Sequence, residues 1–386
     1  MMGSAENRAA ARPIRVAVVD DSAVARRLVI RILAAEPDIE VVIEAGDGEQ
    51  AIDALRTAQA SGKPCDVVVL DVEMPRLGGL EVLPQILRLD PAPRVIMAST
   101  HTRRGAATTL RALSLGASDY VCKPSAEPGA ATEFAADLLA KVRIWSAATR
   151  TPRSLPTTAG PRPAGGGDRV APMNGSATPM SGTGQRRPPL EGTSIRAVAI
   201  GASTGGPQAL ASVLTAFRGH RSVPLLITQH MPATFTPILA EHLGRAAGRP
   251  CAEGQDGEPI ELGRAYLAPG GHHMLALATR GRPIIKITDD PPENFCRPAV
   301  DPMFRSLASV YGSGLVAVVL TGMGQDGLRG CEAVARGGGR VIAQDEGSSV
   351  VWGMPGAVVR HGLADEILPL ERIGQRLVEL VEGRAA

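Results

Sequence analysis

Short apolar runs alternate with amphipathic stretches over the first 145 residues. Between the runs, apolar positions recur with helical spacing, as in SAVARRLVIRILAAE, which Asp21 or Ser22 would cap and Pro37 would end. This alternation predicts a doubly wound parallel sheet. The expected strands cover residues 14–19, 41–45, 66–70, 94–98 and 119–122.

The alternation resumes near residue 196 and predicts a second α/β domain with a mixed, mainly parallel sheet. Two of its runs flank Arg280 and Gly281, which predicts a hairpin with its turn at these residues. The expected strands cover residues 196–200, 223–228, 265–268, 273–279, 283–288, 314–320 and 340–344.

Residues 146–193 differ in composition from both predicted domains. These 48 residues include eight prolines and eight glycines but few large apolar side chains. Such a segment cannot bury enough surface to offset its ordering entropy, so we expect a flexible linker. A coil of this length spans roughly 40 Å. The predicted organisation is a disordered tail at 1–13, a domain at 14–145, the linker at 146–193 and a domain at 194–384.

Composition excludes several classes of protein. The 386 residues carry a net charge of +2, with 44% hydrophobic and 21% charged residues, which is typical of a soluble globular protein that does not bind nucleic acid. The five cysteines form no C-x-x-C motif, which favours a reducing compartment over disulfides or zinc. The N-terminal residues resemble no signal peptide, and no apolar run approaches the ~18 residues of a membrane helix. We therefore expect a cytoplasmic protein with no membrane insertion.

Charged and hydroxyl side chains follow the predicted strands of the first domain. Because ligands bind beyond the carboxyl ends of parallel strands, we expect these side chains to converge at one edge. Clustered carboxylates repel one another and predict a hard cation, Mg²⁺. A metal beside Asp71 suits phosphoryl transfer to that residue, with Ser99 and Lys123 holding phosphoryl oxygens. Taken singly, each residue could equally be a helix cap or a turn former. The set is Asp20, Asp21, Asp71, Ser99 and Lys123.

The same rule places a different chemistry in the second domain. Ser203, His230 and Asp326 each follow a predicted strand, and together they suit a nucleophile, its base and the residue that orients the base. Glycines around Met323 leave backbone N–H groups free to bind an oxyanion. Each residue also has a structural alternative: Ser203 in a tight turn, His230 in the core, and Asp326 in an Asp-Gly turn.

Three other motif interpretations fit less well. Residues 201–205 match G-x-S-x-G, but α/β-hydrolases order the triad Ser, acid, His, whereas here the histidine precedes the acid. GASTGG lacks the G-x-G start of a dinucleotide-binding loop. The C-terminal LERIGQRLVELVEGRAA is amphipathic with balanced charge, which is not typical of a DNA-recognition helix.

Residues 14 to about 145 resemble a response-regulator receiver domain, through the acidic pair, Asp71 in VVLDVEMP and Lys123 before Pro124. The resemblance implies a flavodoxin-like fold with Asp71 as the phosphorylation site. It also implies Ser99, Tyr120 and Lys123 as switch residues. Gly79 replaces the aspartate that many receivers carry in MPRLGG, which affects the turn there. The implied Mg²⁺ ligands are Asp20, Asp21, Asp71 and the backbone carbonyl of Glu73.

Residues 194–384 are similar to the catalytic domain of chemotaxis protein-glutamate methylesterases. The motifs that carry the similarity include IGASTGGP, TQHMPATFT, AYLAPGGHHM, RPAVDPMF and LTGMGQDGLRG. The similarity implies Ser203 as nucleophile, His230 as base, Asp326 as the third member and the Met323 amide as an oxyanion donor. Thr204 is a further candidate, as a partner of His230.

Together the two resemblances imply a phosphorylation-regulated hydrolase. Its substrates would be methylated chemoreceptors, at glutamate γ-methyl esters and at glutamines that it deamidates. Its phosphodonor would be a chemotaxis histidine kinase, and we expect a monomer with no cofactor for the esterase. We hypothesise that the unphosphorylated receiver covers the face bearing Ser203. The alternative is a phosphorylation-switched adaptor without enzymatic activity.

Overall fold

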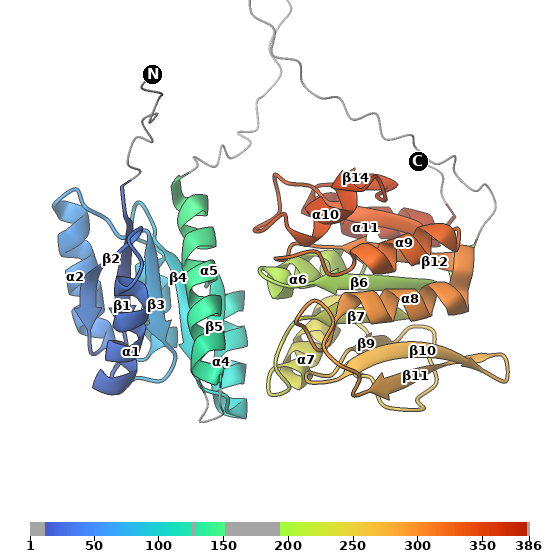
Figure 1. Ribbon diagram of the computed structural model, residues 1–386, viewed down its shortest axis with the longest axis horizontal. Coiled ribbons are helices and arrows are strands. Elements are labelled where there is room, and N and C mark those ends of the chain that lie inside the picture. Colours follow the sequence, from blue (N-terminus) through green and yellow to red (C-terminus); the bar gives the residue numbers. More distant parts are fainter. Residues whose placement is uncertain (1–11, 125–128, 151–193, 384–386) are drawn as a thin grey trace, which may run out of the picture.

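The computed structural model describes residues 12–124, 129–150 and 194–383. These residues form two domains, each built on a parallel sheet (Figure 1). The predicted tail and linker lie outside the described residues, except at the ends that adjoin the domains.

The N-terminal domain contains a five-stranded parallel sheet in the order β2-β1-β3-β4-β5. All five predicted strands are present, so the predicted doubly wound fold is confirmed. The strands are β1 Ile14–Val19, β2 Ile39–Ala45, β3 Val67–Asp71, β4 Arg94–Ser99 and β5 Asp119–Cys122. The helices are α1 Ala23–Ala34, α2 Gly48–Ala60, α3 Gly79–Ile86, α4 Arg103–Ser114 and α5 Ala130–Arg150.

Local sequence signals set the helix boundaries of this domain. Ser22 caps α1, because its side chain accepts a hydrogen bond from the backbone N–H of Ala25. At the other end of the domain, α5 continues to Arg150, past the expected domain boundary at residue 145. The helix continues past residue 145 because Trp145 and Ser146 are both buried. The first proline of the proline-rich segment follows the end of the helix.

The C-terminal domain contains a seven-stranded sheet in the order β14-β13-β12-β6-β7-β9-β8, and every pair in it is parallel. The predicted hairpin is confirmed, but its two antiparallel strands form a separate sheet. The edge strands β8 and β14 were not predicted, because three residues are too few to show a pattern. The strands are β6 Ala197–Ala202, β7 Leu225–Gln229, β8 Cys251–Glu253, β9 Ala265–Leu267, β10 His273–Thr279, β11 Arg282–Thr288, β12 Leu315–Val319, β13 Arg340–Gln344 and β14 Glu366–Leu368.

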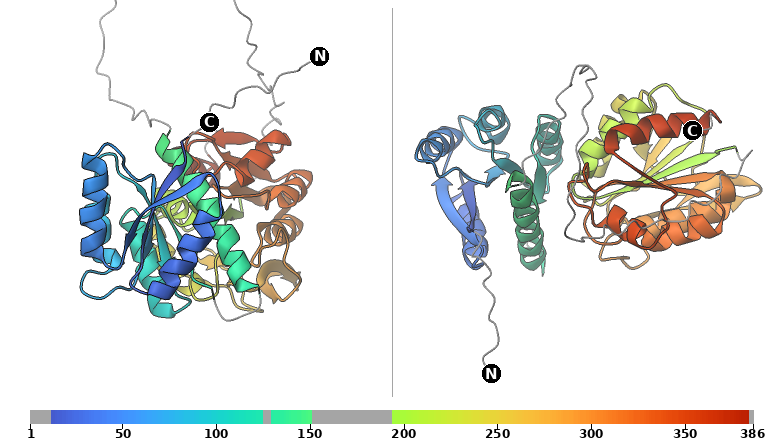
Figure 2. Two further views of the ribbon diagram at one scale, coloured as in Figure 1. Left: turned by 60° about the vertical axis from the view of Figure 1, so that its left-hand side comes forward. Right: turned by 90° about the horizontal axis from the view of Figure 1, so that it is seen from above.

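Helices cover both faces of this sheet (Figure 2). The central strand β6 is buried along its whole length, and its side chains alternate between two apolar clusters. One cluster lies beneath α6, α7 and α11, and the other lies beneath α8, α9, α10 and the hairpin. The helices are α6 Gly206–Ala216, α7 Thr236–Ala247, α8 Val300–Tyr311, α9 Leu328–Arg336, α10 Met354–Arg360 and α11 Leu370–Val381, with a 3₁₀ turn at Gly312–Gly314.

None of the helices in the described ranges is long and apolar enough to cross a membrane.

The contact between α6 and α11 is close because one residue lacks a side chain. A Cβ on Gly374 would lie 2.5 Å from the Cβ of Ala216 and 2.6 Å from the backbone oxygen of Val213. These distances are well below van der Waals contact, and backbone oxygen cannot move aside without shifting the helix. Gly374 therefore fixes how closely α11 packs on α6.

We predict that Gly374→Ala lowers the free energy of unfolding by about 1–3 kcal/mol, because overpacking forces the helices apart. Urea unfolding of the full chain measures this effect. Gly347→Ala is the matched control, since the nearest atom to its added Cβ is 3.9 Å away. Equal stability of the two variants would contradict the proposed close packing.

Candidate active site and acidic pocket

Three strands of the N-terminal sheet bring charged side chains to its carboxyl edge. Asp20 follows β1, Asp71 ends β3 and Lys123 follows β5. The Lys123 Nζ lies 2.8 Å from Asp20 Oδ2 and 2.9 Å from Asp71 Oδ1. The predicted convergence of these three residues is therefore present in the fold.

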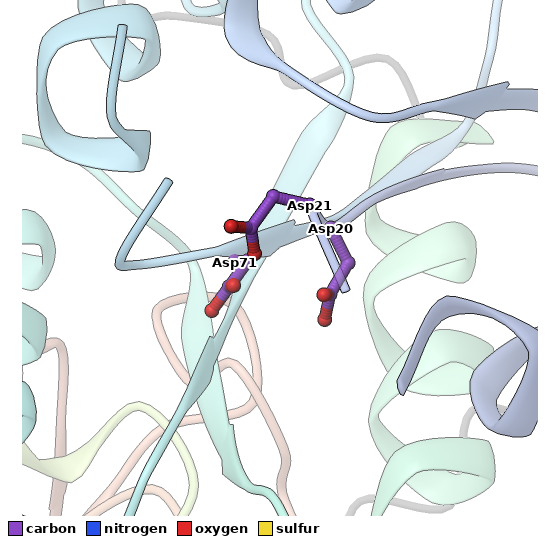
Figure 3. Close-up of side chains that lie close together, drawn as sticks. All are labelled: Asp20, Asp21 and Asp71. Atoms are coloured by element: carbon purple, nitrogen blue, oxygen red, sulfur yellow. The ribbon is translucent and has the colours of Figure 1, made fainter. Parts of the chain in front are cut away.

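Asp21 completes an acidic cluster with Asp20 and Asp71 (Figure 3). One carboxylate oxygen from each residue lies within 4.8 Å of the others. Carboxylate oxygens are the ligands that Mg²⁺ prefers, so this donor set fits the predicted ion. The backbone carbonyl of Glu73 remains a predicted fourth ligand.

Burial and charge shift the pKa values in this pocket. Burial raises the pKa of Asp71, and the ammonium group of Lys123 offsets part of that rise. Burial alone would lower the pKa of Lys123, but contacts with Asp20 and Asp71 outweigh it and raise the pKa. Lys123 thus stays charged, yet one ammonium cannot neutralise three carboxylates. The pocket has an excess of negative charge that suits a divalent cation.

The other predicted switch residues occupy different surroundings. Ser99 ends β4 and is fully buried, and its hydroxyl donates to the carbonyl of Thr100 at 3.2 Å. Tyr120 lies on β5, and its partner belongs to the other domain. Its ring stacks on that of Phe235, with 4.8 Å between centroids. The sequence marked Tyr120 but gave no indication of this partner.

Three adjacent strands of the C-terminal sheet position Ser203, His230 and Asp326. Ser203 follows β6, His230 follows β7, and Asp326 lies in the loop after β12. Because these strands are neighbours in the order β12-β6-β7, their carboxyl ends lie side by side. The three residues predicted from strand ends thus come from one edge of the sheet.

His230 and Asp326 form a direct pair. The Nε2 of His230 lies 2.7 Å from Asp326 Oδ2. Burial alone would lower the pKa of His230, but the carboxylate of Asp326 and the sulfur of Cys296 raise the pKa to about 10. Burial would raise the pKa of Asp326, and its bond to His230 instead holds that pKa below the usual range. This pair therefore favours imidazolium beside carboxylate.

Asp326 is held by a set of further donors. Backbone N–H groups of Val300 and Asp301, in the first turn of α8, donate to it at 2.6 and 3.1 Å. The side-chain amide of Asn294 donates at 3.0 Å, and the N–H of Gly327 donates at the same distance. The carboxylate is thus fixed in orientation and stays ionised although it is buried.

The second ring nitrogen of His230 faces a residue that the sequence analysis did not identify. Its Nδ1 lies 3.4 Å from the Sγ of Cys296. Within the described ranges, no hydrogen bond joins Ser203 to His230. Because Asp326 occupies Nε2, the nitrogen available to accept a proton is Nδ1. The sequence did not predict Asn294 and Cys296, because residues 289–299 show no helical or strand periodicity. The only unusual feature of this segment is its high content of polar residues and prolines.

The turn that carries Ser203 is closely packed. Gly205 caps α6 with a φ of +74°, a conformation that glycine adopts without strain. A Cβ on Gly322 would lie 2.8 Å from the Cβ of Ser203, so the two loops touch where only a glycine fits. Ser203 thus lies just before the N-terminus of α6, where the helix dipole favours negative charge.

Met323 and Thr204, the remaining two predicted residues, differ in their hydrogen bonds. The backbone N–H of Met323 donates to no other group in the part of the chain described here, which leaves it available to an oxyanion. Thr204 is buried, and its carbonyl accepts from the Thr321 hydroxyl at 3.0 Å. The described residues include no hydrogen bond between Thr204 and His230, so its predicted role toward His230 has no geometric support.

The N-terminal domain packs against the edge of the sheet that carries these residues. Figure 1 shows α4 on the side of the N-terminal domain that faces α6 and α7. Gln208, in the first turn of α6, donates its side-chain amide to the carbonyl of Ala117 at 3.1 Å. Val350 packs against the receiver core and also adjoins Gly205. Phe235 also contacts this domain, through Tyr120. These contacts therefore lie next to the segments that carry Ser203 and His230.

Two family models match the chain. The CheB methylesterase model matches residues 198–377, and the response regulator receiver domain model matches residues 16–132. The solved CheB methylesterase catalytic domain of Thermotoga maritima is 39% identical, with a TM-score of 0.48, over 49% of this chain and 100% of that chain. The response regulator domain of Thermotoga maritima CheB is 41% identical, with a TM-score of 0.31, over 35% of this chain and 98% of that chain.

Curated relatives extend the similarity over nearly the full length. The protein-glutamate methylesterase/protein-glutamine glutaminase of group 2 operon from Rhodospirillum centenum is 49% identical over 384 residues, covering 97% of this chain and 95% of that protein. The Azospirillum brasilense protein-glutamate methylesterase/protein-glutamine glutaminase is 48% identical over 373 residues, covering 94% of this chain and 91% of that protein. With this identity across both domains, the chain belongs to the family of protein-glutamate methylesterases/protein-glutamine glutaminases that carry a response regulator receiver domain.

Proposed function

We propose that this chain hydrolyses glutamate γ-methyl esters on chemoreceptors, with Ser203, His230 and Asp326 as the catalytic triad. The observation that carries the proposal is the 2.7 Å pair between His230 and a buried Asp326, at the sheet edge from which Ser203 also projects. A carboxylate with this many fixed donors serves to orient a histidine and stabilise its protonated form.

In the first half of the reaction, Ser203 Oγ attacks the ester carbonyl and transfers its proton to Nδ1 of His230. Asp326 holds Nε2–H, so Nδ1 is the basic nitrogen, and Ser203 has to take the place that Cys296 occupies beside it. The N–H of Met323 donates to the developing oxyanion, an effect worth roughly 3 kcal/mol per donor. When the tetrahedral intermediate collapses, methanol leaves with the proton from His230.

In the second half, water attacks the acyl-enzyme and regenerates Ser203. His230 takes a proton from the water and returns it to the serine oxygen as the glutamate carboxylate is released. A glutamine side chain passes through the same tetrahedral geometry with ammonia as the leaving group. We therefore propose that the same residues deamidate receptor glutamines.

We propose further that phosphorylation of Asp71 relieves an inhibitory contact between the domains. A chemotaxis histidine kinase is the proposed phosphodonor, and Asp20, Asp21 and Asp71 would hold Mg²⁺, which neutralises phosphoryl charge when bound. The stack of Tyr120 on Phe235 and the bond from Gln208 to Ala117 support occlusion of the triad by the receiver. Phosphorylation then shifts the population toward undocked chains.

Methanol release from methylated chemoreceptor membranes tests the proposed chemistry. We predict that Ser203→Ala and Asp326→Asn each lower kcat by on the order of 10⁴-fold or more, because nucleophile and base orientation are lost. Ser222→Ala, which changes an exposed serine before β7, should match wild type. Asp71→Ala should keep basal release but lose stimulation by an acyl phosphate. Methanol release by Ser203→Ala at the wild-type rate would exclude the triad.

The proposed occlusion predicts that Tyr120→Ala raises the rate of unphosphorylated protein by about 2- to 10-fold. An aromatic pair contributes about 0.5–1.5 kcal/mol beyond its buried area, and its loss weakens docking accordingly. The control is Leu33→Ala, which loosens the receiver core on α1 without touching the other domain. If Tyr120→Ala and Leu33→Ala have equal basal rates, the stack does not restrain the enzyme.

The raised pKa of His230 predicts a steep pH dependence in the unphosphorylated chain. A general base acts unprotonated, and a pKa near 10 leaves most of the imidazole protonated at pH 7. The initial rate should therefore rise with pH from 7 toward 10, after subtraction of the Ser203→Ala blank, which measures spontaneous ester hydrolysis. A rate that is flat between pH 7 and 9 would show that the pair does not limit the reaction.

A further inference from the structure

A four-residue turn beside the triad has an unusual backbone. In the segment Glu293–Cys296, called here the 293–296 turn, the two end residues exchange both backbone hydrogen bonds, at 3.2 and 2.9 Å. The central residues Asn294 and Phe295 have φ values of +51° and +62°. Asparagine tolerates this left-handed region, but an aromatic residue there is a genuine outlier.

The 293–296 turn is anchored to the catalytic centre on both sides of Phe295. The side-chain amide of Asn294 donates to Asp326 and to Asp301, at 3.0 Å each. Cys296 lies against His230. Because the residues before and after Phe295 touch two members of the triad, Phe295 is fixed at the rim of the active site.

The side chain of Phe295 is fully exposed, although the receiver is docked. An exposed aromatic ring contributes nothing to the core, and a left-handed backbone is strained for a bulky residue. The fold therefore has no use for a phenylalanine at this position, where asparagine or glycine would relieve the strain. Strain of this kind, observed beside an active site, points to a functional role.

A positively charged side chain, that of Arg329, lies on the same surface. Arg329, in the first turn of α9, lines a shallow hollow together with Phe295 and Asn294. Its side chain is exposed, and it forms no ion pair with the residues that the structure describes. The rim next to Asp326 thus offers an aromatic face and a free guanidinium, the two groups that most often dominate polypeptide recognition.

We propose that Phe295 and Arg329 are the substrate-docking residues of this enzyme. They would receive a helical segment that carries an aliphatic side chain and a carboxylate near the glutamyl ester. The proposal rests on the proposed function, because it takes the receptor helix as substrate. A segment of this chemistry matches the surface in polarity and charge, and unmodified or already hydrolysed glutamates on the same helix supply the carboxylates. Since Phe295 is exposed in the docked state, the substrate can bind before the receiver leaves.

The test compares two substrates under steady-state conditions with acyl phosphate present. One is methylated receptor in membranes, and the other is the γ-methyl ester of N-acetylglutamate amide, which has no flanking side chains. For Phe295→Asn we expect KM for the receptor to rise about tenfold and kcat to change less than twofold. We expect no change for the small ester. Phe295→Leu, which keeps an apolar side chain, should restore most of the affinity, and Arg329→Gln should raise KM more at low salt than at high salt.

Urea unfolding of the same variants separates docking from folding. Because asparagine suits the left-handed backbone, Phe295→Asn should be at least as stable as wild type while it binds receptor less well. The control is Leu262→Asn, an exposed apolar residue before β9, at the opposite end of the strands. An unchanged receptor KM in Phe295→Asn, or an equal loss on the small ester, would overturn the docking role. Absence of methanol release by wild type from both substrates would instead refute the proposed function.

Discussion

The buried carboxylate of Asp326 is the constraint on which the proposed active site depends. An uncompensated charge at this depth costs several kcal/mol, so the surrounding segments have to supply donors. They do so from the N-terminus of α8, from Asn294 in the 293–296 turn and from His230. The same carboxylate therefore positions the histidine, the helix and the turn. A displacement of any one of these segments therefore alters the hydrogen bonds that Asp326 makes to the others.

Much of this arrangement follows from the sequence, because parallel strands present their carboxyl ends at one edge. That rule places Ser203, His230 and Asp326 at one sheet edge, and likewise the acidic residues of the receiver. Asn294 and Cys296 could not be found in this way, because they lie in a turn whose non-glycine residues have positive φ. No periodicity encodes such a turn, and tertiary contacts impose it. The proline-rich composition after residue 150 likewise concealed the last turn of α5.

The proposed restraint and the proposed substrate docking involve different surfaces of the catalytic domain. The receiver contacts Gln208 in the first turn of α6, and Phe235 and Val350 in the loops after β7 and β13. The 293–296 turn lies on the loop between β11 and α8, and Phe295 remains outside the contact. The proposals for restraint and for substrate docking can therefore be tested by separate substitutions.

Strand β5 connects the acidic pocket to the contact between the domains. Lys123, just after its end, pairs with Asp71, and Tyr120 within it stacks on Phe235. The strand is short and lies at the edge of its sheet, and Tyr120 and Val121 within it are buried in the core. A phosphoryl group on Asp71 adds charge and bulk directly against the Lys123 ammonium. Tyr120 lies only three residues before Lys123, and Lys141 holds its carbonyl at 2.7 Å. The restraint proposed for the Tyr120–Phe235 stack and the phosphorylation proposed for Asp71 therefore meet on one short strand.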